Sequence, residues 1–133
     1  MDICSDTNIL IYIANDDSPF HESTSAAIAK ILARGDDLFV FPQNLIEFWV
    51  VATRPLASNG LGLTVSEAEF ELNEIKDTFL VLDETSDIYP EWERLVVAHK
   101  VSGKNVHDTR IVAQMNVHGI VNFLTFNTKD FSR

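Results

Sequence analysis

Residues 38–53 read LFVFPQNLIEFWVVAT, an apolar run followed by a proline and a strongly apolar helical segment. Residues 38–41 are a short run of strand type, and Pro42 takes the first position of a helix that continues to about Thr53. Glu47 is the only ionisable side chain in the stretch. A strand that leads directly into an apolar helix is typical of α/β proteins, in which both elements pack into one core.

The same alternation of short apolar runs and helical segments continues on both sides of this stretch. Strands are expected at residues 2–5, 79–82 and 120–126, and helices at 8–15, 19–34, from 64 onward, 86–102 and 105–118. Parallel strands joined by helices form right-handed crossovers. The sequence therefore predicts a single domain over residues 1–133 with a three-layer α/β/α fold and a short central parallel sheet.

Capping residues mark the ends of the predicted helices. The expected starts are Ser18-Pro19, Thr64 with Glu67 in a capping box, and Asn105, and the expected stops are Gly35, Gly103 and Gly119.

The composition limits the class of protein. Hydrophobic residues make up 46% of the 133-residue chain, which argues against disorder. Cys4 is the single cysteine, so a disulfide framework and a cysteine-based zinc site are both excluded. No apolar run approaches the roughly 20 residues of a membrane span, and Asp2 and Asp6 are incompatible with a signal peptide. We therefore expect a soluble, cytoplasmic domain with no membrane partner.

The net charge of −10 at first argues against a nucleic-acid partner, because binding to phosphates normally needs a basic surface. The charge is unevenly distributed, however. Residues 67–93 hold ten acidic residues and one base, Lys76, whereas residues 94–133 hold six basic and two acidic residues. The acidic block is typical of a solvated helix face, and the total charge therefore does not exclude RNA.

Four carboxylates lie where the strands of such a sheet end: Asp6 after the first strand, Glu47 in the helix after the second, Asp108 in the last helix and Asp130 after the last strand. Each has a purely structural explanation. Asp6 can cap a helix, and Asp108 can face a helix dipole. Glu47 can pair with Arg54, and Asp130 can be a surface turn residue.

If the strands are adjacent, these carboxylates converge on the crevice at the carboxyl edge of the sheet, where parallel sheets bind ligands. A cluster of like charges raises its own pKa values, and a hard divalent cation such as Mg²⁺ or Mn²⁺ relieves that repulsion. Water held by a metal beside a phosphodiester can then carry out in-line hydrolysis. The positions of the four carboxylates therefore indicate a metal site, although their spacing in the sequence does not identify a reaction.

At these residues the sequence resembles the PIN-domain family, in particular the VapC-like toxins of prokaryotic toxin–antitoxin pairs. The matching segments occur in the family's order and span nearly the whole chain: SDTNILIY (5–12), PQNLIEFW (42–49), HDTRIVA (107–113) and LTFNTKDF (124–131). The resemblance implies an endoribonuclease that depends on Mg²⁺ or Mn²⁺. Members commonly continue past the Asp-Phe pair into a final edge strand, whereas this sequence stops at Arg133.

The resemblance also implies roles for individual residues. The family's four acidic positions, which ligate the metal directly or through water, correspond to Asp6, Glu47, Asp108 and Asp130. The supporting polar positions correspond to Asn8, which helps to orient the first aspartate, and to Thr125 and Asn127. Family members usually dimerise, act on RNA and are blocked by a cognate antitoxin that covers the site.

Two further features stay open at this point. Lys104, Arg110 and Lys129 lie near the proposed ligands in the basic part of the chain, where they could hold RNA phosphates or simply face solvent. Ile46 and Val50 leave little polar surface on their helix, which favours burial, either in the core or against a second subunit.

The competing function is a phospho-accepting receiver domain, which is also an acidic α/β domain that binds Mg²⁺. Asp83 ends the predicted strand, and Thr125 and Lys129 lie near the last strand. Against this function, the first strand ends in one acid, Asp6, rather than an adjacent pair, and Glu47 would have no role.

Overall fold

Four short parallel strands form the centre of the part of the chain that the structure describes. The computed structural model describes residues 1–126. The strands are β1 (Asp2–Ser5), β2 (Asp37–Val40), β3 (Leu80–Val81) and β4 (Asn122–Leu124). Their order in the sheet is β3-β2-β1-β4, and every pairing is parallel. All carboxyl ends therefore lie at one edge of the sheet.

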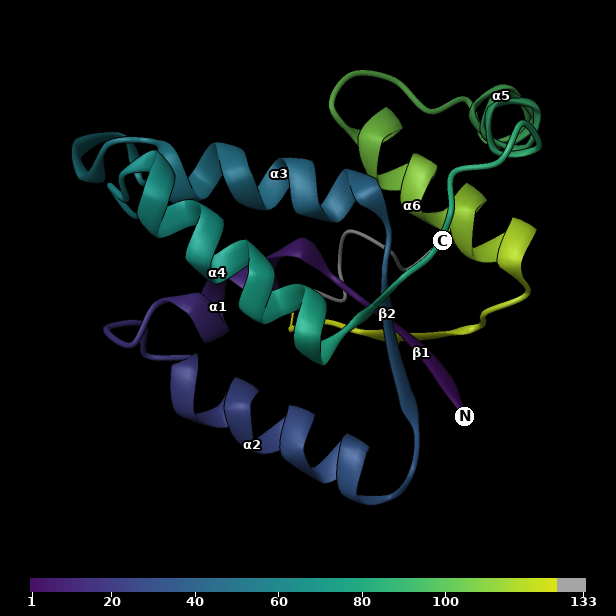
Figure 1. Cartoon of the computed structure of the whole chain (residues 1–133). Coiled ribbons are helices and arrows are strands. Elements are labelled where there is room, and N and C mark those ends of the chain that lie inside the picture. The colour runs from purple at the N-terminus through teal and green to yellow at the C-terminus, as the bar shows by residue number, and fades with distance from the viewer. Residues whose placement is uncertain (127–133) are drawn as a thin grey trace.

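Helices cover both faces of this sheet. They are α1 (Thr7–Ala14), α2 (His21–Ala33), α3 (Pro42–Thr53), α4 (Val65–Thr78), α5 (Ile88–Ala98) and α6 (Asn105–His118), with a short 3₁₀ turn at Leu56–Ser58. Figure 1 shows α5 and α6 side by side at the upper right of the view, and α2 at the bottom. The predicted α/β class with a short parallel sheet is confirmed.

Alternating side chains of the strands supply two separate cores. On one face, Ile3 and Val40 pack with apolar residues of α1, α2, α3 and α4. On the other face, Cys4 packs with Ile111 and Met115 of α6. Because successive strand residues point to opposite faces, this division produces the three layers that the strand–helix alternation predicted.

The helix boundaries show which capping predictions were right. Thr64 and Glu67 form the reciprocal capping box, with the Glu67 amide 3.1 Å from the Thr64 hydroxyl and the Thr64 amide 2.9 Å from the Glu67 carboxylate. Gly119 ends α6 with a φ of 70°. Both predictions are confirmed, since each depends on contacts within a few residues of the chain.

One predicted helix start and one predicted capping residue are wrong. Helix α2 begins at His21 rather than Pro19. The Ser18 hydroxyl accepts a hydrogen bond from the Phe20 amide within a turn and therefore does not cap the helix. Helix α6 already includes Asn105 as its first residue, and Lys104 stands at the cap without a side-chain hydrogen bond.

The predicted end of α5 is also wrong. The helix ends at Ala98 and not near Gly103. Lys100 has a φ of 52°, and the Val101 amide donates to the Val96 carbonyl at 3.0 Å. This is a Schellman motif, in which Lys100 occupies the left-handed position that glycine usually takes.

Within residues 1–126, no helix combines the length and the apolar character needed to cross a membrane.

Candidate active site

Asp6 lies at the carboxyl end of β1, next to the end of β4. Its amide donates to the Leu124 carbonyl at 3.0 Å, which extends the pairing of the two strands by one residue. Its carboxylate accepts a hydrogen bond of 2.8 Å from the Thr125 hydroxyl and a longer one, 3.5 Å, from the Asn8 amide. The first predicted ligand is therefore held between the carboxyl ends of β1 and β4, at the edge where parallel sheets bind ligands.

Glu47 faces the same edge from α3, the helix that follows β2. The Thr7 hydroxyl donates to one of its carboxylate oxygens at 2.7 Å, and the Gln43 side-chain amide donates to the other at 3.2 Å. The Thr7 hydroxyl itself accepts from the buried Asn44 amide at 3.0 Å. Since Thr7 directly follows Asp6 in the chain, this hydrogen-bond chain places the two carboxylates beside each other.

The electrostatics agree with this proximity. Burial raises the pKa of the Asp6 carboxyl, and the charge of Glu47 raises it further, while hydrogen bonds from Thr125, Asn8 and Thr7 act in the opposite direction. The structural explanation for Glu47, an ion pair with Arg54, is not observed: the Arg54 guanidinium donates to the Asn59 carbonyl at 3.1 Å. Hydrogen bonds thus hold two like charges together, an arrangement that a bound cation stabilises.

Gln43 joins this edge to α6. Its side-chain nitrogen donates to the His107 carbonyl at 3.0 Å as well as to Glu47. Its side-chain oxygen accepts from Arg110 and from the buried Gln114, each at 2.9 Å. These four hydrogen bonds, called the Gln43 bracket below, fix the first turns of α6 against α3. The half-buried Asp108 lies in the first turn of α6.

The remaining predicted residues are less directly placed. The Asn8 side chain is exposed, and its contact with Asp6 is made by the backbone amide. Asn127 and Asp130 lie outside the described residues. Within residues 1–126, no three histidine, cysteine, aspartate or glutamate side chains are grouped closely enough to hold a metal ion. That Asp6, Glu47, Asp108 and Asp130 form one metal centre therefore stays a prediction.

Sequence reasoning gave no role to Thr7, Gln43 and Asn44, although all three lie in the quoted motifs. A local signal existed for two of them. Gln43 precedes Glu47 by four residues on the same helix face, and Thr7 adjoins Asp6. The contact between Thr7 and Asn44 spans 37 residues, and no local pattern indicates it.

Replacing Thr7 with valine tests the hydrogen-bond chain. Valine keeps the shape, but it removes one of the two donors to Glu47 and leaves the side-chain nitrogen of the buried Asn44 without its acceptor, so we expect the free energy of unfolding to fall by about 1–3 kcal/mol. Urea denaturation measures the loss. In the control Thr53→Val, the lost hydroxyl bond is to the Trp49 carbonyl within the helix, and a smaller loss is expected. Equal losses would show that Thr7 is not a positioning residue.

The raised pKa of Asp6 predicts a pH dependence of stability. The folded state binds the Asp6 proton more tightly than the unfolded chain does, so the free energy of unfolding falls as the pH rises from the ordinary value of 3.8 to the raised pKa. Asp6→Asn removes this contribution. Without metal, the stability of Asp6→Asn relative to wild type should therefore increase through that pH window and then level off. A pH-independent difference, measured by urea denaturation, would contradict the assigned environment of Asp6.

Comparison with known protein families matches almost the whole chain to one of them. Residues 3–133 match the PIN domain family. Ribonuclease VapC24 of Mycobacterium tuberculosis is 27% identical over 138 residues, an alignment that covers 96% of this chain and 87% of the relative.

Solved structures show the same fold at lower sequence identity. VapC20 of Mycobacterium tuberculosis, a Sarcin-Ricin loop cleaving toxin, superposes with a TM-score of 0.71 at 17% identity, covering 96% of this chain and 92% of that one. A toxin-antitoxin complex from Klebsiella pneumoniae gives 0.66 at 22% identity, with 98% and 90% covered. The family match extends over the whole arrangement of strands and acids described above, and the chain belongs to the PIN-domain family.

Proposed function

We propose that this chain is a metal-dependent endoribonuclease of the VapC type, the toxin of a toxin–antitoxin pair. The observation that carries the proposal is the pair of carboxylates, Asp6 and Glu47, held side by side at the carboxyl edge of the sheet by Thr125, Thr7 and Gln43. The curated relative that it matches is a ribonuclease, and this supports RNA as the substrate class.

The donor set fits a hard divalent cation. Asp6 and Glu47 supply carboxylate oxygens, which Mg²⁺ and Mn²⁺ prefer, and Asp108 and Asp130 complete the set that the family motif implies. A bound ion lowers the pKa of its water and neutralises charge on a phosphodiester. Thr125 and Thr7 keep one oxygen of each carboxylate in place, and the Gln43 bracket holds α6 with Asp108 against α3.

Incubation of the purified chain with a structured RNA tests the proposal. We expect cleavage with Mg²⁺ or Mn²⁺, no cleavage after addition of EDTA, and recovery when the metal is restored. Cleavage at the same rate in EDTA would overturn the metal-dependent reaction.

The receiver alternative is not favoured. Asp83 is exposed and follows β3, which lies at the edge of the sheet and is separated from β1 by β2. Asp83 is thus away from the Asp6–Glu47 pair, whereas a receiver needs its acids together. Labelling of Asp83 by acetyl phosphate would reverse this conclusion.

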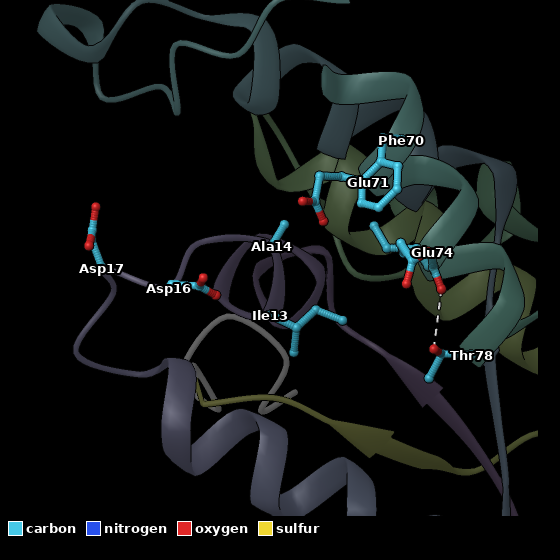
Figure 2. Close-up of a pocket in the computed structure, with 9 residues that line it drawn as sticks. Ile13, Ala14, Asp16, Asp17, Phe70, Glu71, Glu74 and Thr78 are labelled. Carbon is cyan, nitrogen blue, oxygen red and sulfur yellow. Dashed lines mark hydrogen bonds between the residues drawn. The ribbon is translucent and has the colours of Figure 1, made fainter. Parts of the chain in front are cut away.

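An acidic groove between α1 and α4 fits an antitoxin segment. Figure 2 shows Ile13 and Ala14 of α1 across from Glu71 and Glu74 of α4. The groove has a volume of about 580 Å³, and its other lining residues are Asp16, Asp17, Phe70, Ile75 and Thr78. We propose that it binds a basic antitoxin segment whose apolar side chains pack against the exposed ring of Phe70.

The charge of the groove supports this partner. Burial, followed by the charges of Asp16 and Glu74, raises the pKa of Glu71. Cationic side chains in the groove would relieve that repulsion and complement the part of the acidic block that α4 carries.

Charge reversal at Glu74 tests the groove. Glu74→Lys puts a like charge next to the incoming basic segment, so we expect at least about tenfold weaker antitoxin binding with unchanged RNA cleavage. The control is Glu69→Lys, another exposed glutamate of α4 outside the lining. Binding of the co-expressed candidate antitoxin is measured by calorimetry. Equal affinities of the two variants would place the antitoxin elsewhere.

The exposed side of α3 supports a homodimer. Ile46 and Val50 are 65% and 53% exposed, and Leu56 in the following turn is 76% exposed. We propose that a second copy covers this apolar strip. Light scattering should then give twice the 15.0 kDa mass of the chain, and the monomer mass would overturn the dimer.

A further inference from the structure

A cleft opens beside Glu47, between α3, the first turns of α6 and the loop after β3. It has a volume of about 530 Å³ and is lined by Gln43, Ile46, Glu47, Glu84, His107 and Arg110. The Arg110 guanidinium is the permanently charged cation among these lining residues.

Arg110 is tied to the proposed active site through a single side chain. Its Nη1 donates to the Gln43 oxygen at 2.9 Å, and the amide nitrogen of Gln43 donates to Glu47 at 3.2 Å. Gln43 therefore fixes the guanidinium in the same cleft as one of the two paired carboxylates. A cation in the same cleft as a hydrolytic centre is suited to a neighbouring phosphate of a polymeric substrate.

The other side of the guanidinium is held by Glu84. Its Nη2 lies 3.0 Å from the Glu84 carboxylate, and the two side chains are 34% and 44% exposed. An ion pair this exposed to water contributes little to stability, so an incoming anion can replace the carboxylate. A phosphate suits the guanidinium better, since its oxygens accept two parallel hydrogen bonds from the planar fork.

We propose that Arg110 binds an RNA phosphate next to the one that is cleaved, and that Glu84 is a competing counter-ion which the phosphate displaces. The inference rests on the proposed ribonuclease function and adds a substrate-binding residue to it. An ion pair with only a structural role predicts something else: loss of either partner would then have the same effect on RNA binding. Competition predicts opposite effects, because Glu84 repels the phosphate that Arg110 attracts.

The test measures binding of a fluorescein-labelled RNA hairpin by anisotropy, in EDTA and over a range of salt concentrations. Each phosphate contact adds about 0.7 to the slope of log K against log salt for single-stranded sites. We therefore expect Arg110→Gln to lower the slope by about 0.7 and the affinity about fivefold at 0.1 M salt. Glu84→Gln should instead raise the affinity, and Arg110→Lys should keep the slope while losing part of the affinity.

The control is Arg94→Gln, which breaks a comparable ion pair on α5, 2.8 Å from Glu91 and outside the cleft. It should leave RNA binding unchanged. Equal affinity and slope for wild type and Arg110→Gln, or weaker binding by Glu84→Gln, would overturn the proposal, and metal-dependent cleavage by the wild-type chain would still stand. If the slopes differ as expected but no condition yields cleavage, the phosphate site holds and the proposed ribonuclease function fails.

Discussion

Asp6→Asn is expected to reduce metal-dependent RNA cleavage by at least about 100-fold. Loss of a residue that only supports a metal ligand typically costs 10- to 100-fold, and loss of a ligand should cost at least the upper figure. Asparagine can still accept the hydrogen bond from Thr125, so the position of the side chain is preserved. Initial cleavage rates of a labelled RNA with Mn²⁺ measure the effect.

The fold of Asp6→Asn should remain intact. Asparagine removes a charge that burial disfavours and that Glu47 repels, the two causes that raise the pKa of Asp6, so the metal-free stability should be equal or higher. Asp83→Asn is the matched control, because Asp83 also follows a strand of the sheet but lies at its far edge. If the Asp6 variant cleaves RNA as fast as wild type, Asp6 is not part of the catalytic centre.

Glu47→Gln is expected to have the second large effect, again a loss of about 100-fold in cleavage rate. Glutamine can still accept from Thr7, but its amide nitrogen then faces the donor nitrogen of Gln43. The variant therefore removes one charged ligand and loosens the bracket that holds α6. Both consequences lower cleavage, and neither removes an apolar contact from the core.

The measurement is the same cleavage assay, with thermal unfolding as a check of the fold. Glu22→Gln serves as the control, because Glu22 is an exposed glutamate in the first turn of α2. Wild-type activity in Glu47→Gln would mean that the Glu47 carboxylate has a structural role only.

The features that could be predicted from sequence are those encoded by neighbouring residues. The apolar run before Pro42 and the apolar helix after it correspond closely to β2 and α3. The capping box at Thr64 and the glycine stop at Gly119 were right for the same reason. Asp6 was selected as a candidate because it follows a strand, and Glu47 because a carboxylate in an apolar helix is costly without a partner.

Contacts between distant parts of the chain could not be predicted in this way. Gln43 meets Gln114 across 71 residues, and Thr125 meets Asp6 across 119. These contacts depend on the order and register of the strands, and a local sequence pattern predicts neither. The prediction for the end of α5 was wrong for another reason: Lys100 adopts, at a small steric cost, the left-handed conformation that glycine prefers.

The claim that the carboxylates at the sheet edge form one divalent-cation site is tested most directly by Mn²⁺ titration of the wild-type chain, Asp6→Asn and Glu47→Gln in a calorimeter. A cation bound only by the folded state also stabilises it, by about 2.7 kcal/mol at 100 times its dissociation constant. We expect the wild-type chain to bind Mn²⁺ and to melt at a higher temperature in its presence, and both variants to lose binding and the shift together. Identical Mn²⁺ binding by all three chains would contradict the account.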